Sequence, residues 1–168
     1  METLCRGMFP MGHDFPLMLK ELHLKVTPKR IAILDFLARS GTYVNPEEVR
    51  QKLKEQFASI GLPTVYRNLD ELAAGGIVSK IIHPNRQLYY YFCSNSDHHH
   101  HFICLSCRKV MDLNICSVKG LEDEINDQVR GKVMSHILQV NGLCQKCCVI
   151  DKGAGSDRHS RNLKPGLQ

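Results

Sequence analysis

The chain has 168 residues, of which 43% are hydrophobic and 23% charged, as expected of one or two small globular domains. It holds no run of about 18 apolar residues, and METLCRGMFPMGHD at its start lacks the basic and apolar segments of a secretion signal, so we expect a cytoplasmic protein without a membrane partner. The net charge of +5 permits binding to nucleic acid, but residues 1–97 hold 12 basic and 10 acidic groups, so charge alone does not predict it.

The first part of the chain predicts a succession of helices. A short amphipathic helix is expected over residues 16–24. A stronger one follows, because Thr27 can cap its start, Pro28 fits its first turn and Gly41 fits just past its end. The same pattern of cap and proline recurs from Asn45, which predicts another helix there.

A further helix and a hairpin complete this first unit. The segment LPTVYRNLDELAAGG, residues 62–76, has one apolar stripe and ends in two glycines. The β-rich runs 77–82 and 87–92 are joined by the turn signal HPNR. Three helices followed by a hairpin are typical of a winged helix-turn-helix, whose third helix enters the major groove of DNA.

The second unit mixes short strands with a helix. Strands are expected over residues 99–107, 109–115 and 132–144. An amphipathic helix is expected over residues 117–131, with Ser117 as its cap. The chain as a whole is therefore predicted to be an α+β protein.

Two Cys-x-x-Cys pairs, Cys104/Cys107 and Cys144/Cys147, are separated by 36 residues. Each pair can present two thiolates, and together they complete the tetrahedral shell of a structural zinc site. Redox or disulfide turns are the alternative, but paired cysteines in a chain without a secretion signal favour metal. Cys148 is a spare thiol beside the second pair, and neither Cys5 nor Cys116 receives a role.

A run of four histidines, residues 98–101, precedes the first cysteine pair. Side chains alternate between the two faces of a strand, so His99 and His101 share one face while His98 and His100 share the other. Such a strand can supply two separate metal sites. A solvated polar run beside a zinc site is the plainer interpretation.

Four segments together resemble the ferric uptake regulator family of bacterial metal-dependent repressors, in order and with matching spacing: TPKR, LPTVYRNLDELAAGGIV, HHHHFICLSCRKVMDL and HILQVNGLCQKC. The resemblance spans about residues 16 to 147. It implies a homodimer that binds palindromic operators in double-stranded DNA when loaded with metal. The implied domains are an N-terminal extension (1–15), a winged-helix DNA-binding domain (16–92), a dimerisation and metal-binding domain (93–148) and a disordered tail (149–168).

The resemblance also implies two main metal sites. A structural Zn²⁺ falls on the four paired cysteines. A regulatory Zn²⁺ or Fe²⁺ falls on Cys93, His99, His101 and Asp112. Tyr43 stands where the family has a further histidine ligand, and His83 in the wing turn is an alternative ligand.

A third site found in some members of the family would use His98, His100 and His136. The usual glutamate of that site falls near Lys119, and Glu122, one helical turn further on, is a substitute.

Cys93 bears on the metal that is sensed. A set of Cys, His and Asp ligands favours zinc over octahedral iron or manganese, which indicates the zinc-sensing, Zur-like branch of the family. Iron- or peroxide-sensing members remain alternatives, and so does a zinc-stapled interaction module without DNA binding. A zinc enzyme is disfavoured because no His-x-Glu is present and four cysteines leave no open position on the metal, so we expect no small-molecule substrate.

By the same resemblance, the helix that begins near Thr64 reads DNA through Tyr66 and Arg67. Further contacts with the phosphate backbone are expected from basic residues of the first helices and the wing: Lys20, Lys25, Lys29, Arg30 and Arg86.

Overall fold

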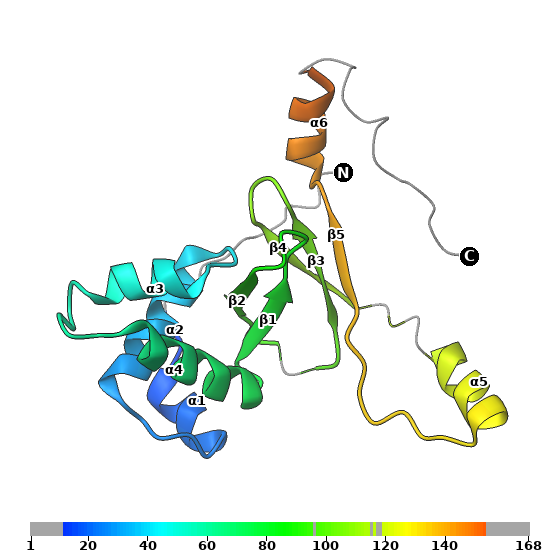
Figure 1. Ribbon diagram of the computed structural model, residues 1–168, viewed down its shortest axis with the longest axis horizontal. Coiled ribbons are helices and arrows are strands. Elements are labelled where there is room, and N and C mark those ends of the chain that lie inside the picture. The colour runs from blue at the N-terminus through cyan, green and yellow to red at the C-terminus, as the bar shows by residue number, and fades with distance from the viewer. Residues whose placement is uncertain (1–11, 96, 115, 117–118, 154–168) are drawn as a thin grey trace.

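The computed structural model describes residues 12–95, 97–114, 116 and 119–153, which form two units that contact each other (Figure 1). Cys5 and Ser117, the expected cap of the helix over residues 117–131, lie outside these residues. The N-terminal unit runs through α1 (Phe15–Glu21), α2 (Pro28–Ser40), α3 (Pro46–Leu53), α4 (Leu62–Ala74), β1 (Val78–Ile82) and β2 (Leu88–Phe92). This is the predicted order of a winged helix.

The helix starts follow from local hydrogen bonding. The Thr27 hydroxyl accepts a hydrogen bond of 3.3 Å from the backbone N–H of Arg30, and Gly41 ends α2 with a φ of 58°. Asn45 and Glu48 form a reciprocal capping box at α3, with side-chain to backbone distances of 2.8 and 2.7 Å. The predicted caps of both helices are confirmed.

The core of the first unit lies between the four helices and the wing. Tyr90 of β2 is fully buried, and its hydroxyl donates a hydrogen bond of 3.1 Å to Asp70 of α4. β1 and β2 are antiparallel, with Val78 opposite Phe92. The fully buried aliphatic side chains come from every helix: Leu19, Ile33, Leu34, Leu37, Val49, Val65, Leu69 and Leu72.

The second unit is built on a three-stranded sheet. The central strand β3 (His100–Cys104) pairs antiparallel with β4 (Val110–Leu113) and parallel with β5 (Gln139–Gly142). Between β4 and β5 the chain makes an excursion through α5 (Lys119–Val129), which stands apart from the sheet in Figure 1. α6 (Gln145–Gly153) follows the last strand.

Two expectations for this unit need correction. The strand predicted over residues 132–144 is confined to Gln139–Gly142, because only that stretch pairs with β3. The sequence predicts a tail from residue 149, but α6 extends from Gln145 to Gly153. Residues 154–168 lie outside the described part of the chain.

The two units meet through the wing and the β3–β4 hairpin. A second hydrophobic core joins residues of both, and Tyr43, with only 1% of its surface exposed, lies at its centre. The Arg108 guanidinium, just after the first cysteine pair, lies 2.6 Å from a carboxylate oxygen of Glu48. The side-chain amide of Gln139 exchanges hydrogen bonds of 3.1 and 2.8 Å with the backbone of Ile82. These contacts set the wing and α3 directly against the second unit.

Within the described ranges, no helix combines the length and the apolar character needed to cross a membrane.

Candidate metal centres and DNA-contacting helix

The four paired cysteines converge between β3 and α6. Cys104 ends β3, Cys107 lies in the following turn, Cys144 follows β5 and Cys147 lies in the first turn of α6. Their sulfur atoms all lie within 4.8 Å of one another, and Cys107 Sγ is 3.7 Å from Cys144 Sγ. Zn–S bonds of about 2.3 Å in a tetrahedron place sulfur atoms roughly 3.8 Å apart. The cluster therefore has the dimensions of a four-thiolate zinc site.

The electrostatics around Cys104 favour the thiolate, which is the form that binds metal. Burial raises the pKa of this thiol. Hydrogen bonds from the backbone N–H groups of Cys107, Cys144 and Ser106 outweigh that effect and lower the pKa to about 6. The N–H of Cys144 donates to Cys104 Sγ across 3.3 Å. The seven cysteines in the described residues are free thiols.

A second cluster lies where the wing meets the sheet. Cys93 directly follows β2, His99 and His101 come from the start of β3, and Asp112 lies opposite His101 on β4. His99 Nε2 is 3.0 Å from Cys93 Sγ and 3.1 Å from His101 Nε2, and an Asp112 oxygen is 3.6 Å from His101 Nε2. All four ligand atoms lie within 4.8 Å of one another. The structure thus gathers the four residues expected for the regulatory site.

Neighbouring groups orient these ligands for metal. His99 Nδ1–H donates a hydrogen bond of 2.6 Å to the carbonyl of Asp97, which turns the lone pair of Nε2 toward the cluster. Burial, and then the neighbouring His99, lower the pKa of His101, so its imidazole is neutral near pH 7. Burial raises the pKa of Cys93, so a cation is needed to hold its thiolate.

His83 does not join this cluster, nor any other group of ligands found among the described residues. Its ring packs in the wing turn, with ring centroids 5.9 Å from Tyr43 and 5.4 Å from Tyr89. Tyr43 itself is buried, and its hydroxyl lies 3.5 Å from the carbonyl of Cys104. At the position where the resemblance implied a histidine ligand, Tyr43 instead packs against the wing turn within the first unit and reaches the second unit through its hydroxyl.

A third group forms on the other face of β3, from His98, His100, His136 and Cys116. The alternation of the histidine run thus separates the two pairs as the sequence indicated. Cys116 was missed, because the resemblance pointed to positions further along the chain. Glu122, the expected substitute, is exposed on α5 and is not part of the group.

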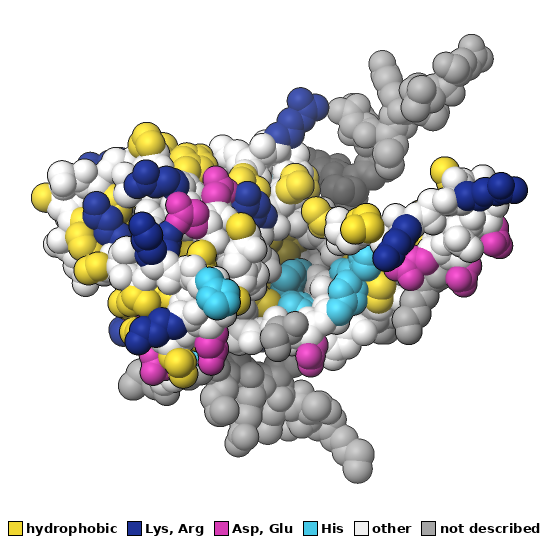
Figure 2. Space-filling view, turned by 90° about the horizontal axis from the view of Figure 1, so that it is seen from below, with side chains coloured by type: hydrophobic (Ala, Val, Ile, Leu, Met, Phe, Trp, Pro, Cys, Tyr) yellow, Lys and Arg dark blue, Asp and Glu magenta, His cyan; other side chains and the backbone are white. Residues whose placement is uncertain are grey.

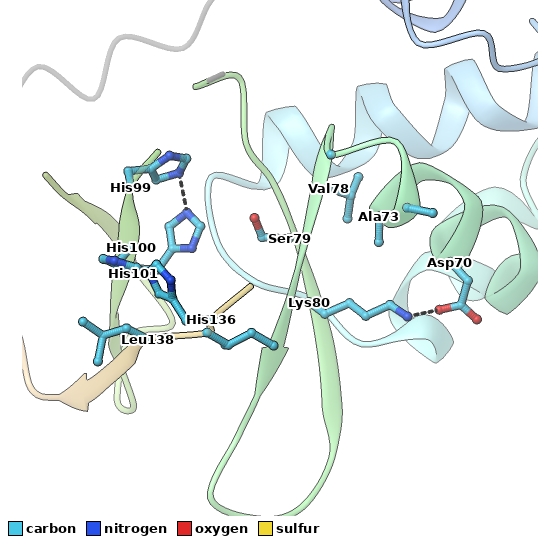
Figure 3. Close-up of a pocket in the computed structure, with 13 residues that line it drawn as sticks. Asp70, Ala73, Val78, Ser79, Lys80, His99, His100, His101, His136 and Leu138 are labelled. Carbon is cyan, nitrogen blue, oxygen red and sulfur yellow. Dashed lines mark hydrogen bonds and ion pairs between the residues drawn. The ribbon is translucent and has the colours of Figure 1, made fainter. Parts of the chain in front are cut away.

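A cavity of about 490 Å³ brings these histidines close to the DNA-binding unit. Figure 3 shows His99, His100, His101 and His136 on one side, with Asp70 and Lys80, joined by an ion pair of 2.7 Å, on the other. In Figure 2, histidine side chains gather in a hollow between the N-terminal unit and the α5 arm. The histidine clusters therefore line the junction between the two units.

Most of the predicted DNA-contacting residues are accessible. Tyr66 and Arg67 are exposed on α4, and Thr64 is half-buried in its first turn. Lys20 and Lys25 are exposed, and Lys29 is half-buried. The basic wing residue, Arg86, is exposed in the turn with a φ of 64°.

Arg30 departs from the expectation of a DNA contact. Its side chain is buried, forms an ion pair with Glu71 of α4 and donates a hydrogen bond of 2.7 Å to the carbonyl of Lys25. It joins α2 to α4 inside the first unit. A phosphate group cannot reach it without breaking that pair.

A winged helix joined to a small domain with three groups of Cys and His ligands defines a class of protein, the metal-responsive transcriptional regulators. The sequence model of the ferric uptake regulator family matches residues 21–141. The chain therefore belongs to the ferric uptake regulator family. As a member it is a regulator and not an enzyme.

Individual relatives agree with this assignment. The ferric uptake regulation protein of Staphylococcus epidermidis is 30% identical over 129 residues, which cover 77% of this chain and 90% of that protein. The peroxide operon regulator of Bacillus subtilis is 29% identical over 129 residues, covering 77% and 88%. The crystal structure of holo XcZur superposes with a TM-score of 0.63 and 28% identity, covering 79% of this chain and 93% of that one.

Proposed function

We propose that the chain is a zinc-responsive repressor that binds palindromic operators in double-stranded DNA as a homodimer. One observation carries the choice of metal: a thiol, Cys93, lies 3.0 Å from His99 in the cluster at the hinge. The structural Zn²⁺ would be held by the four paired cysteines. The regulatory Zn²⁺ would be held by Cys93, His99, His101 and Asp112.

The donor chemistry supports zinc at the hinge. One sulfur, two imidazole nitrogens and one carboxylate form a four-ligand set that suits tetrahedral Zn²⁺, whereas Fe²⁺ and Mn²⁺ prefer more nitrogen and oxygen ligands. Zinc bonds of about 2.0–2.3 Å separate such ligands by roughly 3.4–3.6 Å. The separations of 3.0 and 3.1 Å around His99 are slightly shorter, so a small opening of the cluster admits the ion.

The position of the cluster supports a regulatory role. Cys93 is joined directly to strand β2 of the wing, while Asp112 belongs to the sheet of the second unit. An ion shared between them restricts how the winged helix swings relative to that sheet. A coupling free energy of about 1–3 kcal/mol would change operator affinity roughly 5–150-fold.

The surfaces support the two proposed macromolecular partners. Tyr66 and Arg67 are exposed on α4, where a winged helix meets the major groove. On the second unit, Met134 and Ile137 are 84% and 89% exposed, and a second copy of the chain could cover them.

The variant Cys93→Ser tests the proposal. We expect zinc-stimulated binding to a palindromic, AT-rich duplex to fall at least about fivefold, while the protein keeps its structural zinc and its fold. Fluorescence anisotropy at buffered zinc concentrations measures this, with random DNA as the competitor. Cys148→Ser is the matched control, since its sulfur lies outside the three clusters and contacts the carbonyl of Leu143. Equal zinc stimulation in the two variants would remove Cys93 from the regulatory site.

An iron- or peroxide-sensing regulator is the second candidate. The names of the two curated relatives favour it, since one concerns ferric uptake and the other peroxide. Titration of operator binding with buffered Fe(II) and Zn(II) separates the candidates. Activation by Fe(II) at lower free concentration than Zn(II), with no sulfur in the shell of the second metal by X-ray absorption, would favour iron.

A further inference from the structure

The group on the outer face of β3 contains a polar atom that the rest of the fold does not explain. His100 is only 4% exposed, and its Nε2 has no hydrogen-bond partner among the described residues. A buried ring nitrogen without a partner destabilises the fold, because it loses its hydrogen bonds to water and gains none. Three other ligand-bearing side chains lie within 4.8 Å of it, so a bound cation would satisfy this atom.

The surroundings of His100 have the geometry of a metal shell. The ring centroids of His98 and His136 lie 4.8 and 5.1 Å from that of His100, so three imidazoles converge from two segments of the chain. Cys116 Sγ lies 3.4 Å from His136 Nε2. Nitrogen and sulfur bound to one tetrahedral zinc ion lie roughly 3.6 Å apart, which matches this contact.

We propose that Cys116 supplies a thiolate to a third metal site, completed by His98, His100 and His136, and that this thiolate makes the site selective for zinc over manganese or iron. The resemblance to the family placed a carboxylate near Lys119 instead. In this chain the fourth ligand is a sulfur from the connection between β4 and α5. Three imidazoles and one thiolate form a tetrahedral set with no oxygen ligand, which disfavours metals that prefer oxygen.

An ion bound by these ligands would connect the segments on both sides of α5 to the central strand. Cys116 precedes α5 and His136 follows it, while His98 lies two residues before β3 and His100 begins that strand. An ion bound here joins both ends of the α5 excursion to the central strand. α5 stands apart from the sheet in Figure 1, so zinc should slow amide hydrogen exchange in residues 119–129.

Zinc competition on the full-length protein tests the proposal. We expect wild type and the Cys148→Ser control to bind three zinc ions per chain, and the affinity for one of them to fall at least about tenfold in Cys116→Ser. Zinc-edge X-ray absorption should show fewer sulfur ligands per zinc in that variant. The variant Cys116→Asp restores a carboxylate, so its preference for zinc over manganese should fall at least about tenfold.

Two results would overturn the proposal. One is the same zinc stoichiometry, affinity and sulfur count in Cys116→Ser as in Cys148→Ser. The other is an unchanged preference for zinc over manganese in Cys116→Asp, which also decides the matter if the serine variant fails to fold. The count of three zinc ions includes the ion of the proposed function at the Cys93 cluster. The test itself rests on the difference between Cys116→Ser and Cys148→Ser and involves no DNA binding, so its failure is distinguishable from a failure of the proposed function.

Discussion

The four-cysteine cluster and the Cys93 cluster each gather four ligands, but they join different parts of the molecule. The four cysteines connect β3 to α6 within the second unit, and Cys104 is fully buried. The Cys93 cluster connects the wing to that unit, and its Asp112 is 39% exposed. The buried four-cysteine cluster suits a permanently bound structural ion, and the more exposed Cys93 cluster suits an exchangeable ion. Both clusters have four ligands, so the role of each ion is indicated by the structural elements that it connects.

Removal of a ligand from the four-cysteine cluster should have the largest effect. We expect Cys104→Ser to lose the structural zinc, which contributes on the order of 10 kcal/mol to the folding of small zinc domains. The second unit should then unfold, while the first unit keeps its own core. Circular dichroism, zinc content and sedimentation measure this. If the variant remained dimeric and its second unit still unfolded cooperatively, the four-cysteine cluster would not be required for folding.

Removal of a ligand from the hinge cluster should have a smaller and more selective effect. We expect Asp112→Ala to weaken the exchangeable zinc about tenfold or more and to leave the structural zinc in place. Chelator competition followed by metal analysis measures both ions. Asp97→Ala is the matched control, because Asp97 supports His99 through its backbone carbonyl rather than its side chain. Equal zinc affinity in the two variants would exclude Asp112 from the shell.

The contact between Arg108 and Glu48 should have the smallest effect. Their side chains are 42% and 35% exposed, so we expect the pair to contribute no more than about 1 kcal/mol to the free energy of unfolding. A double-mutant cycle with Arg108→Ala and Glu48→Gln measures the coupling by chemical denaturation. Arg39→Ala, which breaks a pair within α2, is the control. Loss of structural zinc in Arg108→Ala would show that the four-cysteine site depends on the contact with α3.

Local patterns in the sequence predicted much of this arrangement. The caps at Thr27 and Asn45 depend on hydrogen bonds between near neighbours in the chain, so the helix starts could be read directly. The period of two along a strand placed His99 and His101 on the face opposite His98 and His100. The spacing of the cysteine pairs likewise indicated one cluster.

Features set by distant partners could not be predicted in this way. Arg30 reads as a free basic residue, and its burial depends on Glu71 of another helix. Cys116 lies between β4 and α5, where the sequence offers no periodic pattern, so nothing local indicates that it meets His136. α6 begins inside the second cysteine pair and has little apolar periodicity, so the sequence predicts a tail where its last residues lie.

The most direct test of the central claim compares one protein in two metal states. Wild type is treated with EDTA until only the structural zinc remains and is then compared with fully zinc-loaded protein by footprinting on its operator. If an ion at the Cys93 cluster sets the position of the winged helices, the operator should be bound roughly 5–150-fold more tightly in the loaded state. Equal protection of the operator in both states would contradict it.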